Sequence, residues 1–232
     1  MTGWSEIITA AKLLIDDVRW QKEVEISAAR FFRAKSEYVK MALPRLNRPP
    51  GLMDYVKTGM SEPQYDSASW TSTEQSTTEE VTVELGTPGY ELCTVCLRTN
   101  GGLVETPYSE FSYDEGSGSI TFNVQPQAGL EYEIDFYTDG EVNTLSETQM
   151  RLFALAVAVV WDERMDRTWL NLQPKIKDAS FETVNEANWA EKFSQRLLRN
   201  EQSFSDELRK YEQDCAFRAR FSGTGIMGAG LF

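Results

Sequence analysis

Two kinds of hydrophobic pattern divide the chain. Apolar residues recur every three or four positions in residues 5–43 and again from about residue 146 to 221, as on one face of a helix. Between residues 81 and 137 they alternate with polar residues, as in SITFNV and EYEIDFY, which is the pattern of half-buried strands separated by Gly and Pro turns. The sequence therefore predicts an α+β protein: a helical bundle of long helices with an inserted antiparallel β-sandwich or small barrel.

The N-terminal helical pattern contains neither Pro nor Gly from residue 5 to 43. Its apolar stripe is interrupted by Lys35 alone. We expect one long helix, or two helices with a bend near Trp20. Pro44 and the RPPG sequence at 48–51 should end it.

A second helix start is marked by Ser146 and Gln149, which form an S-x-x-Q capping box. Leu145 and Met150 are placed to act as the accompanying hydrophobic staple. We expect this helix to stop before Pro174.

The most apolar stretch is LFALAVAVVW at residues 152–161. It has about half of the roughly 20 residues that a membrane-spanning helix needs, so we expect a buried helix and no membrane partner. Because it is apolar nearly all round, other elements or neighbouring subunits must surround it. The residues assigned by hypothesis to a subunit interface are Leu152, Phe153, Val157, Val160 and Trp161.

The last helical pattern begins near residues 183–188 and runs to about Phe221, which predicts a rod of about 50 Å. SGTGIMGAGLF follows at 222–232. Glycines hold no conformation by themselves, whereas large apolar side chains avoid water. This segment is either a disordered tail or an arm that orders by docking into another subunit. The residues of the partner-docking arm are, by hypothesis, Ile226, Met227, Leu231 and Phe232.

These patterns give a division of the chain into an N-terminal helical part, a linker rich in Ser, Thr and Glu, an inserted acidic β domain, a C-terminal helical part that packs with the first, and a flexible Gly-rich apolar arm. Their ranges are 1–57, 58–80, 81–142, 143–221 and 222–232.

The net charge of -13 is unevenly distributed. Residues 1–57 carry 10 Lys and Arg against 7 Asp and Glu, whereas residues 58–143 carry 16 acidic residues and one basic residue, Arg98. Residues 144–232 are nearly balanced, with 12 basic and 13 acidic residues. The acidic middle segment would repel a phosphate backbone, so we expect no specific binding of nucleic acid there.

Candidate chemistry is sparse. The chain has no His, so the usual general base and the Ser–His and Cys–His pairs are excluded. Cys93 and Cys96 form a C-x-x-C motif within an alternating strand pattern, which points them to opposite faces, and no four-ligand Cys/His zinc site can be completed. In WDERMD, Asp162 and Asp166 alternate with arginines, which favours salt bridges over a metal site. We therefore expect no enzymatic activity, no cofactor and no metal.

Aromatic residues of the β region leave one alternative open. They could form a sugar-binding platform, although most occupy alternating positions at which core packing is the default. These residues are Trp70, Tyr108, Phe111, Tyr113, Tyr132, Phe136 and Tyr137. The alternative function is then a carbohydrate-binding β module on a helical stalk.

The layout of a helical core, a β insertion, long helices and an apolar arm resembles the head-to-tail connector (adaptor) proteins of tailed bacteriophages. The stretch YSEFSYDEGSGSITFNVQPQAGLEYEIDFY at 108–137 is similar to a β module that recurs in phage virion proteins. The matching features are Tyr113, Gly118, the I-T-F strand at 120–122, the turn of Pro126 and Gly129, and the Tyr-rich strand at 132–137.

The resemblance implies a non-enzymatic virion structural protein, made in the host cytoplasm and located at the head–tail junction. It would form a homo-oligomeric ring of twelve subunits below the portal protein and contact the next neck or tail protein. Packaged DNA would pass through the channel without specific binding. An acidic wall would let it slide, and the acidic insertion could face this channel or the next ring. Another neck or tail protein, such as a terminator or baseplate piece, is the alternative.

Overall fold

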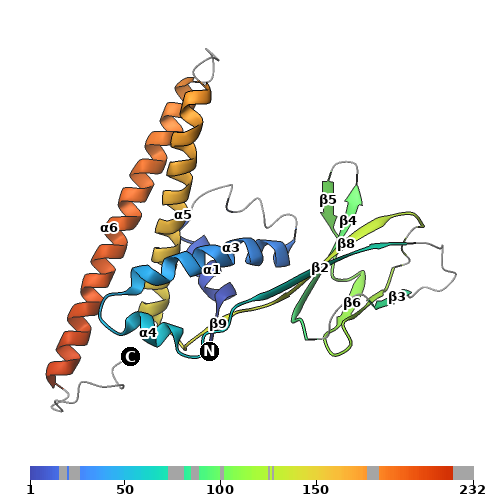
Figure 1. The fold of residues 1–232 in the computed structure, drawn as a ribbon, viewed down its shortest axis with the longest axis horizontal. Helices are drawn as coiled ribbons and strands as arrows, with labels where there is room; N and C mark the ends of the chain where they lie inside the picture. The colour runs from blue at the N-terminus through green and yellow to red at the C-terminus, as the bar shows by residue number, and fades with distance from the viewer. Residues whose placement is uncertain are drawn as a thin grey trace.

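A computed structural model of the chain shows helices at one end, strands at the other, and the long strands β2 and β8 between them (Figure 1). Helices and antiparallel sheets occur in one chain, which confirms the α+β prediction. The described residues are 1–15, 20, 27–72, 81–84, 89–99, 102–124, 126, 128–176 and 183–221.

The helical part contains α1 (Trp4–Lys12), α3 (Ala28–Ala42), the 3-10 helix η2 (Leu43–Leu46), α4 (Leu52–Lys57), α5 (Glu147–Ile176) and α6 (Thr183–Phe221). The prediction of one long helix over 5–43 is wrong, because α1 ends at Lys12 and α3 begins only after Ser27. The Ser27 side chain accepts a hydrogen bond from the Arg30 N–H, which caps the second helix. The alternative prediction was two helices with a bend near Trp20, and Trp20 lies between α1 and α3 in the sequence.

Helix α5 is the centre of the helical part and contacts α1, α3, η2 and α6. The predicted capping box is confirmed: the Ser146 N–H donates to Gln149 Oε1 at 2.8 Å, and the Gln149 N–H donates to Ser146 Oγ at 3.4 Å. The predicted stop before Pro174 is wrong, because α5 continues to Ile176. A proline in the final turn removes one backbone hydrogen bond, and that loss does not end a helix which is about to finish.

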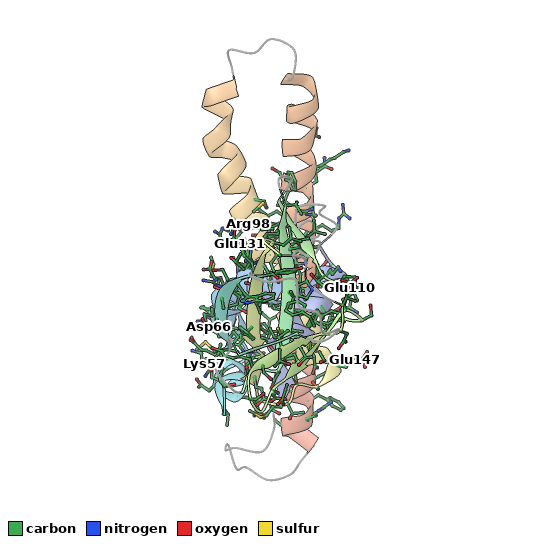
Figure 2. The ribbon with its side chains drawn as sticks, turned by 90° about the vertical axis from the view of Figure 1, so that its right-hand side faces the viewer. Lys57, Asp66, Arg98, Glu110, Glu131 and Glu147 are labelled. Carbon is green, nitrogen blue, oxygen red and sulfur yellow. The ribbon has the colours of Figure 1, made fainter. Side chains whose placement is uncertain are left out.

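Helix α6 has 39 residues, so it is about 58 Å long. Its end at Phe221 confirms the sequence prediction. It lies antiparallel beside α5, and the two form a hairpin whose closed end projects beyond the rest of the helical part (Figures 1 and 2).

The strands form a sandwich. One sheet has the order β2-β8-β4-β5 and the other β3-β7-β6, and all neighbours are antiparallel. Apolar side chains from both sheets meet in one core, so the two sheets pack face to face. The strands are β2 (Gln64–Thr71), β3 (Val81–Glu84), β4 (Leu92–Thr99), β5 (Gly102–Glu105), β6 (Phe111–Asp114), β7 (Ser119–Phe122) and β8 (Glu131–Thr138).

The predicted linker over 58–80 is wrong for residues 64–71, which form β2 and pair with β8 along their whole length. β2 is an edge strand rich in Ser, Thr and Asp, so its hydrophobic alternation is weak. Ala68 and Trp70 nevertheless pack against the sandwich core. Residues 73–80 lie outside the described part of the chain.

The root of the insertion is tied to the N-terminus. β1 (Thr2–Gly3) pairs with β9 (Glu141–Val142), directly after β8. The Ser5 Oγ–H donates to Asp139 Oδ2 at 2.6 Å, and the Trp4 N–H donates to the Gly140 carbonyl at 2.8 Å. The chain therefore enters and leaves the β-sandwich at a fixed point of the helical part.

Candidate functional site: the joint between the helical part and the β-sandwich

The outer face of the four-stranded sheet packs against helix α3. Along β8, Tyr132, Ile134 and Phe136 point into the sandwich core, so the alternate residues Glu133 and Asp135 lie on the opposite face, beside α3. Both sets are protected from solvent, because the helix covers one face of the strand and the second sheet covers the other. We call this contact of α3 with β2, β4 and β8 the joint.

Arg30, near the start of α3, is the central cation of the joint. Its Nε donates to Asp135 Oδ2 at 2.6 Å, and its Nη2 donates to Glu133. The Asp135 side chain is completely buried. Arg98 on β4 binds the same Glu133 and lies 3.4 Å from a carboxylate oxygen of Glu131. These residues form an ion-pair network that crosses from the helix to the sheet.

Tyr65 on β2 completes the environment of Asp135. Its hydroxyl donates to Asp135 Oδ1 at 2.6 Å, so both carboxylate oxygens have a donor. Burial raises the pKa of Tyr65, and the hydrogen bond to Asp135 and its charge raise it further. Burial lowers the pKa of Arg30, but Asp135 outweighs this effect, and the pKa is raised overall. The raised pKa keeps the Arg30 guanidinium charged at neutral pH.

Aromatic contacts extend the joint on either side. Phe32 of α3 stacks on Tyr137 of β8 with ring centroids 5.8 Å apart. The Arg33 guanidinium carbon lies 3.9 Å from the centroid of the Tyr65 ring. An open pocket of about 480 Å³ lies here between α3 and β2. It is lined by Arg30, Arg33, Ala34, Glu37, Tyr65 and Ser67.

Lys35, the residue that interrupts the apolar stripe of the sequence, is 1% exposed. Its Nζ lies 4.3 Å from the Trp161 ring centroid and 4.5 Å from the Trp20 ring centroid. Tyr38 is also within cation–π range, at 5.6 Å. An aromatic cage thus holds this charged side chain inside the helical core.

Asp162 joins the two long helices. It is fully buried and accepts from Arg196 Nε at 2.7 Å and from Asn200 Nδ2 at 2.7 Å, both on α6. The prediction that WDERMD forms salt bridges with its own arginines on one helix face is wrong for Asp162 and Glu163: Asp162 pairs with Arg196 of α6, and Glu163 pairs with Arg45. The side chain of Asp166 lies outside the described residues.

The two cysteines of the C-x-x-C motif are both buried, on opposite faces of β4 as predicted. Cys93 packs in the sandwich core, whereas Cys96 lies opposite Glu133 in the joint. Burial raises the pKa of Cys93 to about 12 and that of Cys96 to about 11, and Asp135 adds to both shifts. Both are thiols, not thiolates, at neutral pH.

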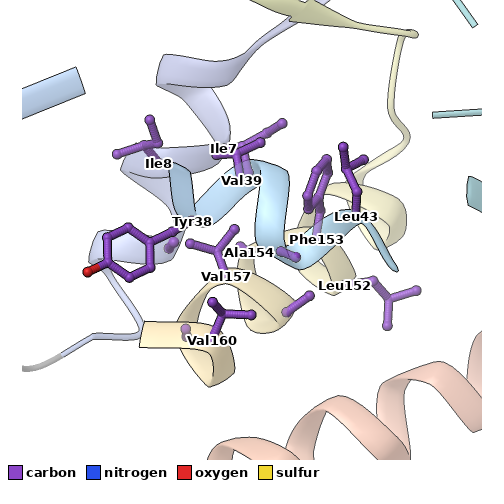
Figure 3. Close-up of a cluster of buried hydrophobic side chains, with 14 of the residues drawn as sticks. Ile7, Ile8, Tyr38, Val39, Leu43, Leu152, Phe153, Ala154, Val157 and Val160 are labelled. Carbon is purple, nitrogen blue, oxygen red and sulfur yellow. The ribbon is translucent and has the colours of Figure 1, made fainter. Parts of the chain in front are cut away.

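The residues assigned to a subunit interface lie inside the helical core of a single chain. Figure 3 shows Leu152, Phe153, Val157 and Val160 among side chains of α1 and α3. Trp161 packs edge-on against Trp20, with centroids 4.9 Å apart. Elements of the same chain are therefore sufficient to cover them, and their role between subunits stays a prediction. The arm residues at 226–232 lie outside the described part of the chain.

The seven aromatic residues proposed as a sugar platform pack mainly in the sandwich core. Phe111, Tyr132, Phe136 and Tyr137 are at most 8% exposed. Trp70 and Tyr113 pack against the same core, and Tyr108 is 54% exposed. The exposed aromatic surface is therefore one ring rather than a platform.

Within the described residues, no group of three or more His, Cys, Asp or Glu side chains is placed to hold a metal ion. Among the same residues, no helix is both long and apolar enough to cross a membrane. The paired charges of the joint can fix the orientation of the sandwich relative to α3. Sequence reasoning missed this joint, and its one signal was the basic N-terminal segment beside an acidic insertion.

Comparisons of the chain with protein-family models, curated proteins and solved structures find no match.

Proposed function

We propose that this chain is a non-enzymatic structural protein of a tailed-bacteriophage virion: a head-to-tail adaptor that forms a ring below the portal. The observation that carries the proposal is a closed helical bundle from which an acidic β-sandwich projects at a fixed angle (Figure 1). A ring of identical copies needs such a rigid protomer, because each copy must repeat the same contacts to its neighbours.

The charge of the sandwich suits passage of DNA without binding. Arg98 is the single basic residue of segment 58–143, and it pairs with Glu131 and Glu133. Arg98 and Glu131 are labelled beside one another in the view of Figure 2, which looks onto the sandwich side of the molecule. A wall of this kind releases no counterions from a phosphate backbone. In the proposed ring the sandwich faces the DNA channel or the next ring, and a position on the outer rim would contradict this part of the proposal.

Mass measurement of mixtures with a candidate portal ring tests the proposal. The full chain, of 26.4 kDa, should add a whole-number multiple of its mass to the portal, with twelve copies expected from the resemblance. A chain that ends at Phe221 should lose this binding if the apolar arm docks on the portal. A full chain that leaves the mass of the portal unchanged would overturn the proposal, and a ring of another symmetry would favour a different neck or tail protein.

A further inference from the structure

The pocket between α3 and β2 contains Arg33, which takes no part in the ion-pair network of the joint. Arg30 is committed to Asp135 and Glu133, and Glu37 lies 3.6 Å from Arg164. Arg33 lies over the Tyr65 ring, and no carboxylate among the described residues pairs with it. One of its donors also meets the Tyr65 hydroxyl, and the other N–H groups of the guanidinium can serve a ligand from outside the chain.

Stacking prepares Arg33 for binding. The Tyr65 ring holds the guanidinium plane at 3.9 Å, and the Tyr65 hydroxyl is itself fixed by Asp135 at 2.6 Å. A stacked guanidinium has fewer rotamers to lose, and its N–H groups still match the two oxygens of a carboxylate. The chemistry of the pocket thus fits an acidic side chain.

The chain itself supplies the complementary surface. Segment 58–143 carries 16 acidic residues against one basic residue, whereas segment 1–57, which contains Arg33, is net basic. In a ring each contact is heterologous: one surface of a copy meets a different surface of the next. Acidic sandwiches placed beside one another would repel, and a cation such as Arg33 on the neighbouring copy relieves this repulsion.

We propose that Arg33 anchors an acidic side chain from the β-sandwich of a second copy of this chain. The inference rests on the proposed ring and names the contact that builds it. The joint then has two roles. Arg30 orients the sandwich within one copy. Arg33, one helical turn further along α3, binds the sandwich of the next copy.

Charge reversal gives the first test. Arg33→Glu should weaken self-association or ring formation about tenfold or more, because it puts like charges in contact. Lys57→Glu is the matched control: Lys57 is exposed on α4 and carries the same charge (Figure 2). The control should assemble as the unaltered chain does. Thermal unfolding of both variants, measured in parallel, shows whether Arg33→Glu has disturbed the joint instead.

Cross-linking gives a second test, which detects the contact itself and does not depend on a loss of self-association. Arg33→Lys keeps the charge and introduces an amine that a carbodiimide can join to a carboxylate in direct contact. Chains with ¹⁴N and ¹⁵N are mixed before the reaction, so that mixed-isotope peptides report links between copies. The expected product joins position 33 of one copy to an Asp or Glu within 58–143 of another. Links from position 33 that occur only within one copy, or only to acids outside 58–143, would overturn the inference.

Different results would rule out the proposed function and the Arg33 contact. If the unaltered chain forms no assembly with or without a portal ring, the proposed function and this contact both fall. If the unaltered chain and Arg33→Glu form the same rings at the same concentration, the ring stands and the role of Arg33 is disproved. Rings that form equally at low and high salt would also disprove it, because an exposed ion pair is weakened by screening.

Discussion

Asp135 sits at the middle of β8 with no exposed surface, although it alternates with Ile134 and Phe136 as a solvent-facing residue would. The alternation predicts which side chains enter the sandwich core. It does not predict that a helix covers the other face of the strand. The same reason hid Arg30, which on the sequence is one charge of a helix. Lys35, by contrast, was visible as a break in the apolar stripe, and its aromatic cage needed the tertiary structure.

Asp135→Asn tests the joint. It replaces one of the two carboxylates that pair with Arg30 by a neutral amide at a fully buried position, so we expect the free energy of unfolding to fall by about 2 kcal/mol. Glu131→Gln is the control: this residue is 44% exposed and lies 3.4 Å from Arg98, so its removal should cost under about 1 kcal/mol. Urea unfolding of both variants gives the comparison. Equal, small effects would show that the buried pair does not hold the sandwich.

Because the pKa values of the buried thiols are raised, we expect the protein to lose stability at high pH. Below about pH 9 Cys93 and Cys96 are protonated in the folded and in the unfolded chain. Above it the unfolded thiols ionise, while burial keeps the folded ones protonated to about pH 11. The free energy of unfolding should therefore fall between pH 9 and 11, by about 1.4 kcal/mol per pH unit for each thiol. Raised tyrosine pKa values, such as that of Tyr137, act in the same direction.

Cysteine variants isolate this effect. The slope of stability against pH should become shallower in Cys93→Ala and in Cys96→Ala than in the unaltered chain. Urea midpoints at pH 8 and pH 11 are sufficient. A slope that neither substitution alters would contradict the assignment to buried thiols.

At the scale of elements, the residues that begin and end helices gave the strongest signals in the sequence. The capping box at Ser146 and Gln149 and the end at Phe221 marked α5 and α6 correctly. β2 was missed because a polar edge strand carries weak alternation and takes its conformation from its partner β8. α5 passed Pro174 because the rule for a proline stop is strict only in a helix interior.

Gln149 has a second role that gives a prediction at this scale. Besides capping α5, its Nε2 donates to the Tyr211 hydroxyl of α6 at 2.9 Å, in a buried position. Ser146→Ala should cost about 1 kcal/mol of stability for the cap. Gln149→Ala should cost about 2 kcal/mol, because it also removes the amide that donates to the buried Tyr211 hydroxyl.

A double-mutant cycle separates the two roles of Gln149. Tyr211→Phe combined with Gln149→Ala should be less harmful than the sum of the single changes, whereas Tyr211→Phe combined with Ser146→Ala should be additive. Thr148→Ala, at an exposed position in the same first turn, is the control and should be nearly neutral. Additive costs in both cycles would show that the contact between the helices contributes nothing.

At the scale of the whole molecule, the helical core is closed within one chain. Trp4, Ile7, Leu152 and Phe153 are 0% exposed without any neighbour, so assembly has to use surfaces outside this core. Among the described residues, surfaces outside this core include the acidic sandwich, the pocket at Arg33 and the exposed face of α6. Sequence reasoning could name the acidic segment and the arm, but the pocket is made by residues of α3 and β2 that only the fold brings together.

Electron microscopy of the purified chain mixed with a candidate portal ring tests whether this protein forms an adaptor ring. We expect end-on views of closed rings with a central channel, twelvefold by the resemblance, in which the sandwich of each copy lies against the helical part of the next. Particles that remain single chains beside unaltered portal rings would contradict the adaptor account.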